Sequence, residues 1–415
     1  LLNGETGSFS LTGNDATLTV AGGVTNYDLP VDVAAFTLAG GAPSLSVGHL
    51  LDAATGAFSL TGNAAGLAET ERLAADTGTF VLTGNAVAAS RGFAIAADLG
   101  AFTLTGNAAT LKSNAVITAD TGTFALNGQQ TTLRQNYRLN AETGTFTATG
   151  QPATLRHNPK VEAASGTFAL SGGTPALLRG RYLSGGAGTF IETGQPATFR
   201  RTWAIRPTAG TFTFTGNAAA LTEVGAYEID AVAGSFALTG NPAQLAQSQS
   251  LPVDAGTFAL TGQPAALRRN YALIAATGAF AFTGNAATLR YNQRIAADTG
   301  TFALSGGSPT LTHSYSLIGG RGSFNLTGNA AALAKTSALG LTAATGTFAL
   351  TGNQAVFKAA RSITAATGVF ALTGNNANLA DTDRIFAEPG SFVLTGQSAT
   401  LTKTSIARRR NVLIF

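Results

Sequence analysis

The fold is decided by the stretch Ile117-Thr-Ala-Asp-Thr-Gly-Thr-Phe-Ala-Leu-Asn-Gly-Gln-Gln-Thr-Thr-Leu133, copies of which fill the chain of 415 residues. Aligned on Phe124, the copies number 18, and 14 of the 17 gaps between successive phenylalanines are 22 residues long. A fixed period between about 20 and 50 residues is typical of repeat architectures. The sequence therefore predicts one array of repeats rather than two or three globular domains.

Apolar residues come in pairs within this stretch. The pairs lie seven and five residues before the phenylalanine, at the phenylalanine and two after it, and seven and nine after it. A spacing of two is typical of a strand with one buried face. A glycine separates successive pairs, as in Thr-Gly at the first corner and Gly-Asn or Gly-Gln at the second. Glycine followed by Asn is typical of a corner that needs a positive φ. Each repeat is therefore predicted to hold three short strands and two corners.

All three longer gaps fall in one part of the repeat, after its last leucine. They lie in Val20–Asp28, Thr222–Glu228 and Ala334–Gly340, whereas the 17-residue segment around the phenylalanine never changes length. Because length variation belongs in loops, we expect the third corner to be an exposed loop.

These features predict an all-β repeat protein, an elongated β-solenoid of about 18 coils. At ~4.8 Å between paired strands, the coils would form a rod roughly 85 Å long. Phenylalanine and leucine ladders would fill its core, and the ten Asn and five Gln after the second glycine would form an amide ladder. A tandem β-hairpin array and an intertwined trimeric fibre shaft remain alternatives, because the same columns are buried in each.

The repeat also predicts the organisation of the chain. Residues 1–50 are irregular repeats or an N-terminal cap, residues 51–404 form the regular array, and residues 405–415 leave the pattern. The last segment is basic and then apolar, which favours a cap or a peptide that docks into a larger assembly. Its candidate docking residues are Arg408, Arg409, Arg410, Leu413, Ile414 and Phe415.

Composition limits the possible functions. The net charge is only +4, so nucleic-acid binding is not expected, and the chain has no cysteine for a disulfide or a thiolate metal site. It has no apolar run of 18 residues, and we expect no membrane insertion. A chain without methionine that begins at Leu1 is expected to be a processed form or part of a longer protein.

No set of residues indicates catalysis. The histidines are scattered, no nucleophile lies in a recognisable motif, and neither a cofactor nor a metal site is expected, so we predict that the protein is not an enzyme. An acidic column lies four residues before the phenylalanine, which could bind calcium between coils but is better interpreted as a solvated corner. Its members are Asp76, Asp98, Asp120, Glu142, Asp298 and Glu388.

A basic column lies ten residues after the phenylalanine. On a solenoid it becomes a broken stripe along one edge, either a contact surface for an acidic partner or a means of keeping a sheet edge soluble. Tyr137 and Tyr271 lie near it in the sequence. The column consists of Lys112, Arg134, Arg156, Arg200, Arg268, Arg290 and Lys358.

The copies Ala296–Gly306 and Thr277–Leu289 resemble tandem repeats of uncharacterised virion proteins of tailed bacteriophages. The resemblance implies a structural component located in the virion, such as a tail or head fibre, spike or decoration. It also implies other virion proteins as partners, self-association that includes a trimer, and contact with a host-surface glycan. Alternatives are a bacterial surface or secreted adhesin that binds carbohydrate and, more remotely, an ice-binding protein with an outward threonine array.

Overall fold

The computed structural model places the chain in two compact units, Leu1–Thr202 (unit 1) and Trp203–Phe415 (unit 2), which we describe separately. The structure describes residues 8–13, 17–19, 28–30, 35–52, 54–90, 94–112, 116–134, 138–156, 160–178, 182–200, 204–222, 228–229, 232–290, 294–312, 316–334, 340–387, 389–402, 405–406 and 412–414. Within these ranges the chain forms strands, turns and bends, and no helix.

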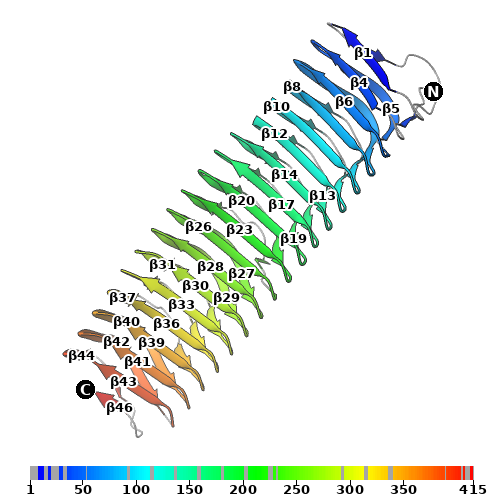
Figure 1. Cartoon of the computed structure of the whole chain (residues 1–415). Coiled ribbons are helices and arrows are strands. Elements are labelled where there is room, and N and C mark those ends of the chain that lie inside the picture. Colours follow the sequence, from blue (N-terminus) through cyan, green and yellow to red (C-terminus); the bar gives the residue numbers. More distant parts are fainter. Residues whose placement is uncertain are drawn as a thin grey trace. The chain divides into compact units, whose positions relative to one another are not determined.

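Each unit is a parallel β-solenoid, as the strand stacks in Figure 1 show. A residue pairs with its equivalent one repeat later, so that Phe102 faces Phe124 and Leu104 faces Leu126. All strand pairs within the units for which a register is described are parallel, which excludes a tandem array of hairpins because hairpins pair antiparallel. A single chain supplies every rung, so a trimeric shaft is not needed either.

The middle strand of each coil carries the phenylalanine. In unit 1 these strands are β1 (Phe9–Gly13), β4 (Ala35–Gly40), β6 (Ala57–Gly62), β8 (Thr79–Ser90), β10 (Ala101–Lys112), β12 (Thr123–Arg134), β14 (Thr145–Gly150), β17 (Thr167–Gly172) and β20 (Thr189–Gly194). In unit 2 they are β23 (Thr211–Gly216), β26 (Ser235–Gly240), β28 (Thr257–Gly262), β30 (Ala279–Thr283), β33 (Thr301–Gly306), β36 (Ser323–Gly328), β39 (Thr347–Thr351), β41 (Val369–Thr373) and β43 (Ser391–Thr395). The last strand, β46 (Val412–Ile414), extends this stack with Val412 in place of the phenylalanine.

The third strand follows the second glycine corner. It is formed in unit 1 by β2 (Thr17–Thr19), β5 (Ser44–Asp52), β7 (Ala64–Ala75), β15 (Ala153–Arg156), β18 (Ala176–Leu178) and β21 (Ala197–Arg200), and by the ends of β8, β10 and β12. In unit 2 it is formed by β24 (Ala219–Thr222), β27 (Ala243–Val253), β29 (Ala265–Ala275), β31 (Ala287–Arg290), β34 (Thr310–Thr312), β37 (Ala330–Ala334), β40 (Gln354–Ala365), β42 (Asn376–Ala387) and β44 (Ser398–Thr402).

The first strand precedes the first glycine corner. In unit 1 it is β3 (Asp28–Pro30), β9 (Ala94–Ala97), β11 (Val116–Ala119), β13 (Arg138–Ala141), β16 (Lys160–Ala163) and β19 (Tyr182–Gly185), and the ends of β5 and β7. In unit 2 it is β22 (Ala204–Pro207), β25 (Glu228–Ile229), β32 (Arg294–Ala297), β35 (Ser316–Gly319), β38 (Gly340–Ala343) and β45 (Ser405–Ile406), and the ends of β27, β29, β40 and β42.

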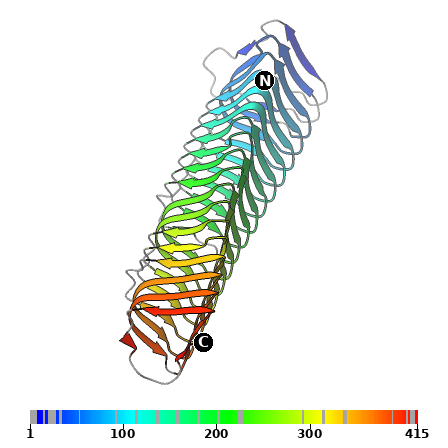
Figure 2. The same cartoon turned by 90° about the vertical axis from the view of Figure 1, so that its left-hand side faces the viewer.

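These strands differ from the prediction in one respect. Three short strands per coil are expected, but β8, β10 and β12 continue through the second corner, and β5, β7, β27, β29, β40 and β42 continue through the third. Figure 2 shows the chain of each unit bending from one stack of strands into the next. The described residues form about 13 turns of solenoid, and the predicted count of 18 coils is not confirmed. Several third corners that would close a coil, including the three longer gaps, lie outside the described residues.

The core of unit 1 is a ladder of stacked phenylalanine rings beside a ladder of leucines. Phe102 stacks on Phe80 at 4.8 Å and on Phe124 at 5.1 Å between ring centroids, with the rings within 6° of parallel. All three rings are fully buried. The register of the strands sets this spacing, because each ring lies one strand separation from the next. The predicted internal ladders are confirmed.

The ladder of unit 2 is locally disturbed where a second phenylalanine replaces the leucine. Phe282 occupies that column, and Phe280 is tilted by 43° against Phe258 and by 40° against Phe302. Beyond this coil the stacking resumes, with Phe302 and Phe324 at 4.7 Å and 3°. The larger ring fills the space that a leucine leaves, and the neighbouring rings rotate to accommodate it.

Apart from Gly172, the described corner glycines are required for close approach between coils and not for a positive φ. Gly172 is the one described glycine with a φ in the left-handed region. A Cβ built on Gly122 would meet the carbonyl oxygens of Gly100 and Ala97, the latter at 2.9 Å, and the nitrogen of Gly100 at 3.1 Å. The predicted conformational reason was therefore wrong, because the stacked corners leave no room for a side chain.

Polar side chains bond neighbouring coils at both corners. At the second corner Asn107 donates from its amide to Asn85, which in turn donates to Asn63, each at 3.3 Å, so an amide ladder is confirmed there. At the first corner the hydroxyls of Thr121 and Thr143 each donate to a backbone carbonyl one coil earlier, both at 2.7 Å. These bonds satisfy carbonyls at the turns, where strand pairing ends.

Candidate functional site

The structure brings the basic column of unit 1 into register. Strand pairing sets Lys112 beside Arg134 and Arg134 beside Arg156, and all three side chains are exposed. The next rung places Leu178 beside Arg156, and Arg200 follows it in register. Three cations thus occupy successive rungs about 4.8 Å apart.

Unit 2 holds a shorter part of the same column. Arg268 and Arg290 pair in register and are exposed, with Ala246 and Thr312 on the flanking rungs. Lys358 is exposed beside Ala380 and has no basic neighbour across that pairing. Tyr271 belongs to β29. Tyr137 lies outside the described residues.

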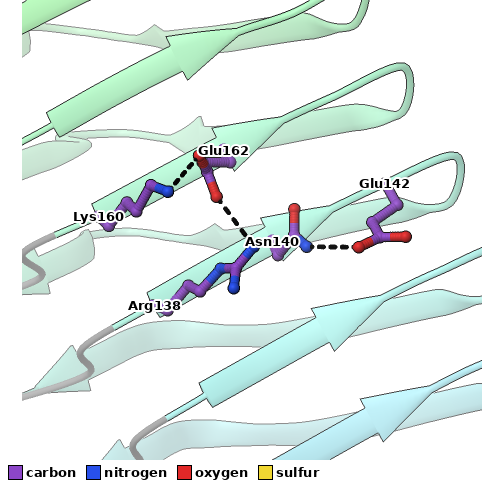
Figure 3. Close-up of polar contacts among 5 residues, drawn as sticks. All are labelled: Arg138, Asn140, Glu142, Lys160 and Glu162. Carbon is purple, nitrogen blue, oxygen red and sulfur yellow. Dashed lines mark hydrogen bonds and ion pairs between the residues drawn. The ribbon is translucent and has the colours of Figure 1, made fainter.

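Figure 3 shows a second pair of stacked cations, which share one carboxylate of the same chain. Arg138 of β13 and Lys160 of β16 face each other in register. Glu162 accepts from both, at 3.2 Å from Arg138 and 2.6 Å from Lys160. Beside it the amide of Asn140 donates to Glu142 at 3.0 Å. No carboxylate within the described ranges forms an ion pair with Lys112, Arg134 or Arg156. These three cations therefore lack the carboxylate partner that Arg138 and Lys160 have.

A groove of about 510 Å³ runs along the uncompensated cations of unit 1. Thr154 and Arg156 of β15 lie on the outward face together with Pro152, which precedes the strand, and Ala153 and Leu155 are buried between them. In this coil the threonine therefore lies between a proline and an arginine. The groove is lined by Thr132, Arg134, Pro152, Thr154, Arg156, Thr174, Pro175, Ala176, Leu178, Pro196 and Thr198.

Two further grooves follow the second corner, one in each unit. They measure about 840 Å³ from Gly40 to Gln129 and about 980 Å³ from Ser305 to Gln397, and are lined by Thr, Ser, Gly, Asn and Gln residues. In the coils with a proline two residues after the corner glycine, this glycine is buried rather than half-buried. The buried glycines are Gly150, Gly194, Gly240 and Gly262.

Sequence analysis missed these grooves, although a signal was present. The dipeptides Gln-Pro and Asn-Pro at residues 151–152, 195–196, 241–242 and 263–264 mark the coils in which the corner is filled. In the coils that line the two grooves, the residue two positions after the corner glycine is not proline, and the glycine is half-exposed.

The acidic column also stacks in unit 1. Asp98, Asp120 and Glu142 lie on successive first corners, and Asp254 of unit 2 occupies the same column, a member that the sequence reading overlooked. Partial burial raises the pKa of Asp120, and the negative charges of Glu142 and Asp98 add to the shift. Within the described ranges no group of three or more potential ligands gathers for a metal ion.

Glu192 is the exceptional residue of the core. It occupies the leucine column of unit 1, in register with Leu170, and is fully buried. Neither carboxyl oxygen has a hydrogen-bond partner among the described residues. Burial raises the pKa of this carboxyl well above its ordinary value, and the backbone of Thr198 opposes the shift to a smaller extent. Burial therefore favours the protonated form of Glu192 in the folded chain.

Replacement of Glu192 tests this assignment. Between its ordinary pKa near 4.5 and its raised pKa, the folded state binds more protons than the unfolded state. Stability should therefore fall as the pH rises from about 4.5. Glu192→Gln should lose this pH dependence, and Glu192→Leu should gain about 1–3 kcal/mol at neutral pH. Hydrogen exchange over residues 189–200 measures both effects, and identical pH profiles for wild type and Glu192→Gln would contradict a protonated core carboxyl.

The predicted docking segment is partly described. Ser405–Ile406 pairs with β42, and Val412–Ile414 pairs with β43 so that Val412 faces Phe392 and Ile414 faces Leu394. Leu413 and Ile414 thus belong to a further middle strand, which continues the solenoid. Arg408, Arg409, Arg410 and Phe415 lie outside the described residues.

Comparisons with known proteins give no relative: the chain matches no protein-family model, no curated protein and no solved structure. The part of the chain that the structure describes holds no helix that is long and apolar enough to cross a membrane.

Proposed function

We propose that the chain is a non-enzymatic structural protein of a bacteriophage particle, a rod or fibre component such as a tail fibre, spike or decoration. The observation that supports this proposal is the regularity of each unit, in which ring ladders, leucine ladders and glycine corners repeat in register. Stacked parallel coils bury their backbone hydrogen bonds and resist bending and proteolysis. Such a protein performs its function through its shape.

We also propose that the whole chain forms eighteen coils. Each of the 18 phenylalanines would mark one coil, and the coils would extend over about 85 Å, against about 60 Å for thirteen. Negative-stain microscopy of the purified chain measures this length. A length near 60 Å would reject eighteen coils.

The location is tested by fractionating a phage lysate on a density gradient. We expect peptides of this chain to sediment with purified particles at a fixed ratio to the major capsid protein. Recovery with the cell envelope or in the particle-free supernatant would reject the virion and favour an adhesin.

A further inference from the structure

The groove beside Arg134 and Arg156 combines apolar rings, hydroxyls and guanidinium groups. Each of its coils places a residue near the second corner, one at the centre of the third strand and one at its end. In the coil of β15 these are Pro152, which precedes the strand, Thr154 and Arg156. The preceding coil supplies Thr132 and Arg134, and the following coil has Ala176 and Leu178 at the last two positions.

The positive charge of this groove has no counterpart within the described chain. Like charges directly opposite each other on paired strands are destabilising. Unit 1 relieves one such pair, Arg138 and Lys160, with Glu162, as Figure 3 shows. Arg134 and Arg156 have the same in-register arrangement without any described carboxylate. An external anion would supply the missing charge.

We propose that this groove binds a linear acidic polysaccharide that carries carboxylate groups, lying along the stacking direction. A guanidinium group offers a planar fork that matches a carboxylate with two hydrogen bonds. The hydroxyls of Thr132, Thr154 and Thr198 both donate and accept, which suits the hydroxyl-rich edge of a sugar chain. Pro152 and Pro196 are exposed and supply apolar surface for the C–H faces of the sugar rings.

Other polyanions fit the groove less well. A peptide strand finds no free backbone partner, because β15 and β18 are already paired along their length, so only side chains face the groove. Duplex DNA presents a phosphate every ~3.4 Å per strand, whereas the cations are ~4.8 Å apart. Single-stranded nucleic acid is bound largely by stacking on aromatic rings, and none of the described residues that line the groove is aromatic.

The test is a binding titration of the full chain with oligogalacturonate at low salt. Arg134→Gln combined with Arg156→Gln should weaken binding at least about tenfold, the loss of two charge-assisted pairs. The matched control, Arg268→Gln with Arg290→Gln, removes the same charge from the same column outside the groove and should change binding less than about twofold. Leu178→Arg should extend the line of cations and tighten binding severalfold.

Each other outcome would overturn the proposal. Equal weakening by both double variants would mean general attraction to a basic surface. Unchanged binding in the Arg134/Arg156 double variant, or no binding of oligogalacturonate at all, would reject the site. Tighter binding of a 20-base-pair DNA duplex or of dextran sulfate, lost in the same variant, would assign the groove to another polyanion. Unaltered thermal unfolding of the variants confirms that they fold, and virion location plays no part in this test.

Discussion

Gly122→Ala is expected to destabilise unit 1 by about 3 kcal/mol or more, at or above the upper end of the range for overfilled sites. The new methyl group would meet three backbone atoms of the preceding coil, at Gly100 and Ala97, and no flexible side chain that could move aside. Separation of the coils would also weaken the strand pairs on both sides. Chemical denaturation followed by circular dichroism measures the loss.

The matched control is Gly66→Ala in the same unit. A Cβ at Gly66 has Ser44 Cβ as its nearest neighbour, at 4.0 Å, and Gly66 lies within β7. Alanine in a strand loses less conformational entropy on folding than glycine, so this variant should gain about 0.5–1 kcal/mol. Similar stabilities for the two variants would show that close stacking is not why glycine is needed at the corner.

Phe102→Ala is expected to destabilise unit 1 by about 3–5 kcal/mol, the usual effect of emptying a buried aromatic site. The ring is fully buried and stacks on both neighbours, so its loss leaves a cavity and breaks the ladder in two. Hydrogen exchange should report faster opening of the coils on either side, because each coil of a solenoid is held chiefly by its neighbours.

Leucine substitutions separate the destabilisation caused by a cavity from that caused by the loss of ring stacking. Phe102→Leu keeps most of the volume and should destabilise by about 1–2 kcal/mol. Phe280→Leu should destabilise less, because its ring is already tilted by about 40° against both neighbours and loses less stacking. Equal losses at the two sites would mean that stacking geometry contributes little to the ladder.

Most of the fold could be predicted from the period and the columns. The alternation around Phe124 identifies the inward residues, and the constant segment Ile117–Leu133 identifies the coil. The reason for glycine could not be predicted, because the sequence does not show how closely Gly122 approaches Gly100. Nor could the merged strands such as β10, since a corner and a continuous bend have the same apolar spacing.

The candidate surface was less predictable than the fold. The period puts Arg134 and Arg156 on one line, but a charge column alone does not separate a solvated edge from a binding groove. To make this distinction, one must know which residues lie beside each cation. Examples are Glu162, which pairs with Lys160, and Pro152, which lines the groove beside Arg156. Both signals were present in the sequence, but their meaning depends on which strand face they occupy.

The register of the coils has a consequence for how such a chain changes over time. Every rung presents the next with the same pattern, Phe on Phe and Gly on Gly, so one coil can serve as neighbour to almost any other. Removal or duplication of one whole 22-residue repeat preserves each of these contacts. Insertion or deletion of a single residue within a strand instead turns its buried face outward. The number of coils in such a chain can therefore increase or decrease by whole repeats, and each new neighbour makes the same contacts as the old one.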